Sequence, residues 1–319
     1  MRARLIVNPA SGADRAMEQL PLINTRLGTL MRDIDVSITS GIEDAARAAA
    51  RAVDEGCDAL YVAGGDGTLN AVLSGLASKG DPMPRIPIGI IPFGTGNDFA
   101  RTLGLGGRPE AALDALLDAN VIDVDVGMLN DRPFVNVSAG GFVADASEMI
   151  TESLKDSTGK LAYVIGGARA LLGSAPFAAT LTIHDGESAA AKGWARDVEL
   201  QMFAVCNART IGGGHPIAPE ALVDDGLLDA FLVRRMPALE FVTVLQRIAL
   251  GEHVGDARVL HFRAAAFDLQ LDRSVHVNAD GEVLEADRCR YTLRPRAARF
   301  FCGPHPYALG RPVPLGPRR

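Results

Sequence analysis

Cysteine and long apolar runs are both scarce in this sequence. The four cysteines lie far apart among 319 residues and form no CxxC pair, so we expect reduced thiols rather than a disulfide framework or a zinc site. The best apolar stretch, "LAYVIGGARALLG", is broken by Arg169 and falls short of the roughly 18 residues that a membrane-spanning helix needs. The N-terminus has no signal-peptide core. These absences predict a cytoplasmic protein with at most peripheral membrane contact.

Positive charge is also limited, because 32 Lys and Arg residues stand against 39 Asp and Glu, giving a formal net charge of −7. General nucleic-acid binding needs a basic field facing phosphates, so we expect no nucleic-acid partner. The chain has no Walker GxxxxGK[ST] motif, and no GxGxxG fingerprint follows its first strand. HExxH and GxSxG are absent too, which leaves zinc-protease and triad-hydrolase chemistry without support.

The first third of the chain alternates strand-like and helix-like patterns. Short apolar runs predict strands at residues 3–7, 35–39, 59–63 and 86–93. Helical spacing, caps and an N-terminal proline predict helices at residues 42–56, 68–78, 97–103 and 109–119. Strands that alternate with helices imply crossover connections, so this part is predicted to be an α/β domain with a doubly wound parallel sheet.

The pattern changes near Val121, where short alternating runs between turns predict an antiparallel, strand-rich domain. Helical inserts are predicted at residues 144–154, 159–172 and 237–250. The late run "AARFFC" is a candidate strand that returns to the first domain, a point that the residues leave open. The predicted division is a nucleotide-binding α/β domain over 1–122, a β-rich domain over 123–295, and a return strand with a loose tail over 296–319.

Small-residue loops follow three of the predicted N-terminal strands: "NPASG" at 8–12, "GGDGT" at 64–68 and "PFGTGNDFAR" at 92–101. Glycines let a ligand reach backbone N–H groups, and helix N-termini attract phosphate. Ligands of open α/β sheets bind at the carboxyl ends of the strands, so all three loops are expected to face one phosphate-binding crevice. Thr68 and the Asn97-Asp98 pair are expected to cap helices. Asp66 is expected to order its loop or to hold a cation through water.

Two Asp-Gly sequences in the second part carry carboxylates with two possible roles each. Asp224-Asp225-Gly226 fits a hairpin turn and fits a Mg²⁺ site equally well, because Mg²⁺ prefers oxygen ligands and keeps several waters. Asp280-Gly281-Glu282 reads first as a turn, and its carboxylate is also a candidate acceptor for the proton of a substrate hydroxyl. The residues alone leave both alternatives open.

Together the motifs "NPASG", "GGDGTLN", "IIPFGTGNDFAR", "GGGHPIAPEALVDDGLLD" and "NADGE" resemble those of the diacylglycerol kinase catalytic family. The resemblance is to the soluble bacterial lipid kinases in particular, which share this catalytic domain with sphingosine and ceramide kinases. It implies an NAD-kinase-like nucleotide-binding domain followed by an antiparallel β-sandwich-like domain, with the active site in the cleft between them. The motifs keep the family's order and span almost the whole chain.

The resemblance implies roles for individual residues. Asp280 would be the general base, and Asp225 would organise a structural Mg²⁺ through water, helped by the backbone carbonyls of Leu222 and Leu227. ATP would be bound by Asn8, Pro9, Ser11, Gly12, Thr39, Gly64, Gly65, Asp66, Gly67, Thr68, Asn70, Thr95 and Glu282, with Glu282 serving as a nucleotide or metal contact.

The resulting hypothesis is a transferase of lipid metabolism that uses ATP and Mg²⁺ to phosphorylate a lipid hydroxyl at the membrane surface, with diacylglycerol as the leading acceptor. Sphingoid bases, ceramide and phosphatidylglycerol are the alternative acceptors, because an apolar cleft discriminates poorly between lipids. NAD kinase and a non-catalytic nucleotide- or lipid-binding regulator are the rival functions. The oligomeric state is open, with a homodimer among the options.

Overall fold

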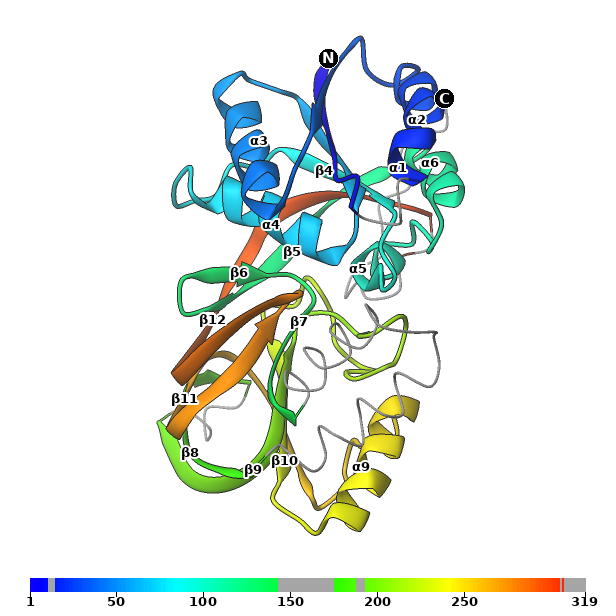
Figure 1. Ribbon diagram of the computed structural model, residues 1–319. Helices are drawn as coiled ribbons and strands as arrows, with labels where there is room; N and C mark the ends of the chain where they lie inside the picture. The colour runs from blue at the N-terminus through cyan, green and yellow to red at the C-terminus, as the bar shows by residue number, and fades with distance from the viewer. Residues whose placement is uncertain (11–14, 143–174, 188–192, 305, 307–319) are drawn as a thin grey trace.

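A computed structural model describes residues 1–10, 15–142, 175–187, 193–304 and 306 of the chain. The molecule is elongated, with an α/β part formed by the N-terminal residues at one end and a β-rich part at the other (Figure 1). β-strands run from one part into the other, so the two parts are joined by a continuous sheet.

The N-terminal sheet is parallel, in the order β4-β3-β1-β2. Its strands are β1 (Arg2–Val7), β2 (Asp33–Ile38), β3 (Ala59–Gly64) and β4 (Pro87–Pro92). The central strand β3, "ALYVAG", is buried at every position, as expected for a parallel strand with helices on both faces. The predicted parallel α/β arrangement is therefore confirmed.

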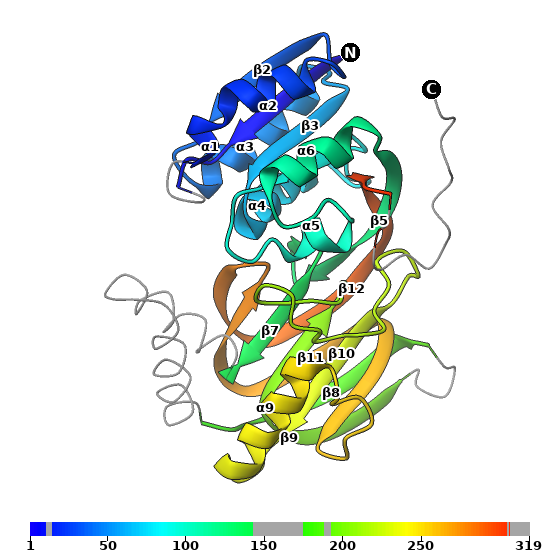
Figure 2. The same ribbon diagram turned by 90° about the vertical axis from the view of Figure 1, so that its right-hand side faces the viewer.

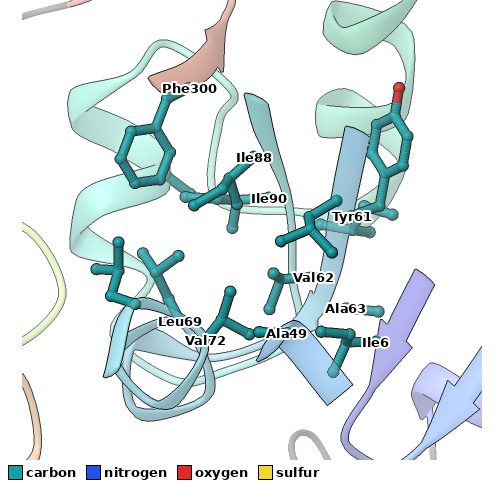
Figure 3. Close-up of a cluster of buried hydrophobic side chains, with 14 of the residues drawn as sticks. Ile6, Ala49, Tyr61, Val62, Ala63, Leu69, Val72, Ile88, Ile90 and Phe300 are labelled. Atoms are coloured by element: carbon teal, nitrogen blue, oxygen red, sulfur yellow. The ribbon is translucent and has the colours of Figure 1, made fainter. Parts of the chain in front are cut away.

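Helices cover both faces of this sheet (Figures 1 and 2). They are α1 (Arg15–Glu18), α2 (Leu20–Leu27), α3 (Ile42–Asp54), α4 (Asp66–Ala77), α5 (Asp98–Thr102) and α6 (Pro109–Leu117). The α3 and α4 helices lie together on one face, where a Cβ on Gly75 would come within 2.2 Å of the Ala46 carbonyl oxygen. The side chains of α4 meet Val62 and Ile90 of the sheet in the core shown in Figure 3.

The β-rich part is built mainly from antiparallel strands. Its elements are β5 (Asn120–Leu129), β6 (Arg132–Phe134), β7 (Val137–Gly141), β8 (Phe177–Gly186), β9 (Trp194–Cys206), β10 (Leu228–Arg234), α9 (Ala238–Leu250), β11 (Val259–Ala279) and β12 (Glu282–Cys302). The predicted helix at 237–250 is confirmed as α9. The four cysteines are free, in agreement with the expected reduced thiols, and all four are buried.

The last strand, β12, connects the two parts of the molecule (Figure 2). It pairs antiparallel with β5 and then parallel with β4, where Arg299 lies opposite Pro87 and Phe300 opposite Ile88. Phe300 enters the N-terminal core beside Ile88 (Figure 3). The return to the first domain is thus present, but it is the end of one long strand rather than the additional strand expected from the sequence. Because β5 and β12 run through the predicted boundaries, the division at 122 and 295 stays a prediction.

The alternating run at residues 133–142 does not form one continuous strand. Within "PFVNVSAGGF", β6 and β7 are separated at residues 135–136, whose backbone N–H groups donate to the Asp280 carboxylate instead of to a neighbouring strand. The predicted inserts at 144–154 and 159–172, the apolar stretch around Arg169 and the C-terminal tail beyond residue 306 lie outside the described residues. Within the part that is described, no helix is both long enough and apolar enough to span a bilayer.

Candidate active site

The three small-residue loops come together at the carboxyl ends of β1, β3 and β4, as expected. The Asn8 side-chain amide donates to the Thr68 hydroxyl at 2.9 Å, which joins the first loop to the second. The backbones of the second and third loops touch, because a Cβ on Gly65 would lie 3.0 Å from the Gly94 Cα. These contacts join the loops into one edge above the sheet.

The glycines of "GGDGT" have different functions. A Cβ on Gly64 would lie 2.7 Å from the Thr68 side chain. Gly65 has no room for a side chain because it packs against the backbone of Gly94. A Cβ on Gly67 would have no described atom within 4 Å. Gly67 lies in the first turn of α4, where backbone N–H groups have no partner within the helix and favour anions. Gly64 and Gly65 therefore serve packing, while Gly67 leaves room for a ligand.

Asp66 orders the loops, which is one of the two functions expected for it. Its carboxylate accepts the backbone N–H groups of Asp98 and Phe99 at 3.3 and 3.4 Å, and thereby caps α5 from another loop. Burial raises the pKa of Asp66, and the nearby charge of Asp98 raises it further. Asn97 occupies the N-cap position of α5, as expected, but its side chain donates to the Gly94 carbonyl rather than capping the helix. The cap expected of Thr68 is wrong, because Thr68 lies inside the first turn of α4.

Asp280 lies in a two-residue turn between β11 and β12, and its carboxylate is buried at the same time. Asp280 and Gly281 both have positive φ, 48° and 95°, as a tight hairpin between twisted strands requires. The carboxylate accepts the backbone N–H groups of Val135 at 2.7 Å, Asn136 at 3.1 Å and Val137 at 2.8 Å. The two readings of Asp280-Gly281-Glu282 are therefore compatible, since the turn presents the carboxylate to these donors.

The surroundings of Asp280 bring the pKa of its carboxyl close to neutral pH. Its residue is 7% exposed, and burial raises the pKa of the carboxyl to about 7. The three backbone donors favour the carboxylate and lower the pKa, while the charge of Asp66 adds a smaller rise. A carboxylate with a pKa near 7 is suited to accept a proton at physiological pH.

A cleft of about 210 Å³ brings the loops and Asp280 together. Gly67, Gly96 and Asp98 line it from the α/β part, and Asn136, Asn278 and Asp280 line it from the β-rich part. Gly281 faces Gly67 across it, because a Cβ on Gly281 would lie 3.8 Å from the Gly67 Cα. The cleft therefore joins a phosphate-type loop to a candidate base.

Three polar side chains of this cleft were missed by sequence reasoning. The Asp98 carboxylate accepts the Gly213 N–H at 2.9 Å, the Asn136 amide donates to the Thr210 carbonyl at 3.0 Å, and the Asn278 oxygen accepts the Gly281 N–H at 2.8 Å. Asp98 could have been found, because it stands within "GTGNDFAR". Asn278 could also have been found, because it is the first residue of "NADGE", whereas Asn136 sits in an ordinary strand pattern and carries no local signal.

Glu282 does not line the cleft. Its carboxylate pairs with Arg132 at 3.1 Å, and it borders a second cavity of about 650 Å³ formed with α3, α4 and the β5–β6 hairpin. Ile42, Ala71 and Ser74 form the helical wall of this cavity. Glu282 follows Gly281 directly in the chain, so the cavity begins where the cleft ends.

The remaining predicted nucleotide contacts vary in how accessible they are. Thr39 is buried, and its hydroxyl donates to the Val7 carbonyl at 3.2 Å. Asn70 is buried, and its amide donates to the Ala279 carbonyl at 3.3 Å, which joins α4 to the strand before Asp280. Thr95 is exposed and Pro9 partly exposed. Ser11 and Gly12 lie outside the described residues, and the assignment of all these residues to ATP stays a prediction.

The predicted metal loop contains a cluster of carboxylates. Asp225 accepts the Leu227 N–H at 3.1 Å and forms an ion pair with Arg263, while buried Asp125 accepts the Gly226 N–H at 2.7 Å. Burial raises the pKa of both Asp225 and Asp125. Within the described part of the chain, no group of three or more His, Cys, Asp or Glu side chains is placed to hold a metal directly.

Comparison with known proteins gives matches over nearly the whole chain. Residues 2–129 match the family model of the diacylglycerol kinase catalytic domain, and residues 135–302 match the YegS C-terminal NAD kinase beta sandwich-like domain. The diacylglycerol kinase of Staphylococcus aureus (strain MRSA252) is 32% identical over 88% of this chain and 86% of its own length. That of Bacillus subtilis (strain 168) is 29% identical over 88% and 89%.

The same relationship is visible in three dimensions. A crystal structure from Bacillus anthracis str. Sterne, provisionally named a diacylglycerol kinase, superimposes with a TM-score of 0.78. It is 26% identical, and the match covers 95% of each chain. The expected combination of an NAD-kinase-like α/β domain with a β-sandwich-like domain is confirmed by the two family models.

Proposed function

This chain belongs to the diacylglycerol kinase catalytic family and is an ATP-dependent lipid kinase, and we propose that its acceptor is diacylglycerol, which it converts to phosphatidic acid. Two relatives that match over most of the chain carry the name diacylglycerol kinase, which supports this acceptor over sphingoid bases, ceramide and phosphatidylglycerol. The observation that carries the catalytic part is the position of Asp280, across a narrow cleft from Gly67.

ATP is proposed to lie along the edge formed by the loops, with its phosphates at Gly67 and its nucleoside in the cavity beside α4. The cavity volume of about 650 Å³ suits a nucleoside, and its border at Glu282 adjoins the cleft. The first turn of α4 supplies N–H groups and a favourable dipole for the phosphates. Glu282 would then contact the nucleoside rather than the transferred phosphoryl group.

Phosphoryl transfer depends mainly on positioning and on neutralising charge, so the chain's own residues have few chemical steps to perform. The lipid hydroxyl oxygen attacks the γ-phosphorus, the bond to the β–γ bridging oxygen breaks, and ADP leaves. The hydroxyl proton passes to the Asp280 carboxylate, whose pKa of about 7 allows it to accept and later release the proton. The backbone N–H groups of residues 135–137 hold the carboxylate in place.

The residues around Asp225 fit a Mg²⁺ ion bound through water. The donors are carboxylates and backbone carbonyls, which hard cations prefer, and the carboxylates of Asp125, Asp225 and Asp229 repel one another. Arg263 already engages Asp225, so this carboxylate would reach the ion through water, with help from the carbonyls of Leu222 and Leu227. Mg²⁺ would supply positive charge that stabilises the loop; a second role, with ATP, follows from the family's chemistry.

The acceptor of a lipid kinase lies in a membrane, so we propose that the protein works in the cytoplasm and contacts the bilayer peripherally and transiently. A homodimer is compatible with this proposal, and nucleic acid is not a proposed partner. The net charge of −7 means that any contact with an anionic bilayer depends on local basic residues.

The test is γ-phosphate transfer from Mg·ATP to a panel of lipids in mixed micelles, with NAD and water as further acceptors. Wild type is expected to label diacylglycerol and Asp280→Asn to label almost none. Transfer to NAD would indicate an NAD kinase, and labelling of another lipid would replace the acceptor. ATP binding without transfer to any acceptor would indicate a regulator. Undiminished transfer by Asp280→Asn would remove Asp280 from its role as base.

A further inference from the structure

A third cavity, of about 630 Å³, adjoins the cleft on the side of α5. Arg101 in its wall follows Asp98 of the cleft by one helical turn, and Thr210 directly precedes Ile211 of the cleft. In Figure 1, α5 lies on the opposite side of the molecule from α3 and β6, which border the nucleoside cavity. If ATP occupies the nucleoside cavity as proposed, this third cavity stays open to another ligand.

The cavity has a positive charge although the protein as a whole is acidic. Two arginines line it, and none of its described lining residues is Asp or Glu. Arg101 is partly neutralised, since it bonds to the Gly96 carbonyl and lies 3.4 Å from the Asp98 carboxylate. Arg209 donates only its Nε, to the Ala221 carbonyl at 2.9 Å. Its two terminal nitrogens form no hydrogen bond or ion pair with any residue that the structure describes.

Next to Arg209 is a buried hydroxyl without a partner. The Thr210 Oγ1 forms no hydrogen bond with a described atom, although the Thr210 carbonyl accepts the Asn136 amide at 3.0 Å. Buried polar groups are nearly always hydrogen-bonded, so this unpaired hydroxyl, on a residue that lines the cavity, indicates a missing partner. A free guanidinium fork and a hydroxyl together provide donors for a tetrahedral anion.

The rest of the wall is apolar, and the cavity is larger than a bare anion needs. Pro216, Pro219 and Pro304 contribute ring surface, and glycines line much of the remainder. Inorganic phosphate would occupy only a small part of about 630 Å³, a volume within the usual range for organic ligands. A ligand that combines a phosphate with apolar atoms matches both kinds of wall.

We propose that this cavity binds the phosphate of a phospholipid through Arg209, Thr210 and Arg101, beside the acceptor cleft and separate from ATP and Asp280. A phospholipid could occupy it either as the acceptor itself or as a second lipid bound next to the acceptor. The shared chemistry is a phosphate ester with acyl chains. The proposal concerns binding and does not depend on the identity of the phosphorylated hydroxyl.

The test is calorimetric titration of the full chain with monomeric dihexanoyl phosphatidylglycerol, with dihexanoylglycerol and inorganic phosphate as the comparison probes. The wild type is expected to bind the phospholipid more tightly than either probe. Arg209→Gln should weaken binding by roughly tenfold to a hundredfold, as for the loss of a charge-assisted hydrogen bond. The control Arg196→Gln changes the same charge on exposed β9, away from the cavity, and should leave binding unchanged.

Thr210→Val is the second variant, because it keeps the volume and removes only the hydroxyl. It should weaken phospholipid binding by roughly threefold to tenfold. Its melting temperature should be equal to or above that of wild type, since the hydroxyl has no partner to lose among the described residues. This variant keeps the proposal testable if Arg209→Gln disturbs the loop at Ala221.

Addition of Mg·ATP to the bound complex then distinguishes the two sources of the phosphate. Labelling of the phosphatidylglycerol would make it an acceptor, while binding without labelling would make it a second lipid; both outcomes support the site. Equal affinity for inorganic phosphate, with the same dependence on Arg209, would overturn the phospholipid assignment. Undiminished binding in both Arg209→Gln and Thr210→Val would overturn the site. Because calorimetry needs no turnover, failure of the kinase proposal would be visible separately.

Discussion

The α/β part and the β-rich part form their sides of the cleft by different means. The α/β side uses short continuous loops, in which Gly64 and Gly65 allow close packing and Gly67 leaves room for a ligand. The β-rich side uses Asp280, held by N–H groups of residues 135–137, more than 140 positions away in the chain. The first arrangement depends on local backbone geometry and the second on tertiary packing.

This difference suggests that the α/β side serves ligand binding and the β-rich side serves proton transfer. Bare backbone on the α/β side presents N–H donors whose charge does not change with pH. The carboxylate on the β-rich side has a pKa of about 7 because it is buried, so its charge changes within the physiological range. We therefore expect changes on the β-rich side to affect turnover most, and changes in the loops to affect stability and ATP binding.

The largest effect is expected from Asp280→Asn, which keeps the shape of the side chain and removes the proposed base. Turnover should fall by about 10²–10⁴-fold, the usual worth of general-base assistance. ATP affinity, measured by calorimetry, should change little, because the loops proposed to contact the phosphates are untouched. A variant that keeps near-normal turnover, or that loses ATP binding instead, would break the proposed separation of the two sides.

The pH dependence is the next largest effect. Below about pH 7, kcat/KM should fall by about tenfold for each pH unit as Asp280 becomes protonated, and it should level off above. Stability should move in the opposite direction. The folded protein keeps this proton up to about pH 7, while the unfolded chain releases it near 3.8, so stability falls as pH rises between these values. Rates and melting temperatures measured across pH 5–8 would check both slopes, and parallel slopes would contradict the assignment.

A matched pair of glycine variants sharpens the comparison within the loops. A Cβ on Gly94 would lie 2.7 Å from the Gly65 Cα, so Gly94→Ala should cost about 1–3 kcal/mol of unfolding free energy. A Cβ on Gly67 meets nothing described within 4 Å and lies in a helix, so Gly67→Ala should be neutral or stabilising by up to about 1 kcal/mol. Denaturant unfolding and ATP titration would separate them. Gly67→Ala should weaken ATP binding, and unchanged binding would argue against phosphates at this position.

The smallest effect is expected at the link between the first two loops. Asn8→Ala removes the hydrogen bond to Thr68 and should cost about 0.5–1.5 kcal/mol of unfolding free energy. Thr68→Ala should cost a similar amount, and the double variant should cost less than the sum, because both lose the same bond. Additive costs in this double-mutant cycle would show that the two loops are not coupled through this pair.

Several features of the fold and site were predictable because the physical requirement is local. Alternation of buried strands with helices predicted the parallel sheet, and the glycine-rich loops followed from the need for bare backbone at strand ends. The tight turn at Asp280-Gly281 was also readable, since both residues suit positive φ. The continuity of β12 could not be predicted, because Pro295 and Arg296 interrupt its alternating pattern. The strand continues past this break because it pairs with β5 on both sides of it.

The sequence by itself determined which residue types stand at the cleft: bare glycines, an ordering aspartate and a candidate base at the ends of recognisable elements. Only the tertiary structure decided what those residues do. Asp66 became the cap of a helix 32 residues away, Glu282 left the cleft for the adjoining cavity, and Asp280 acquired a pKa of about 7. The reason is that desolvation and long-range hydrogen bonds depend on which distant segments pack together, and no short stretch of sequence specifies its own surroundings.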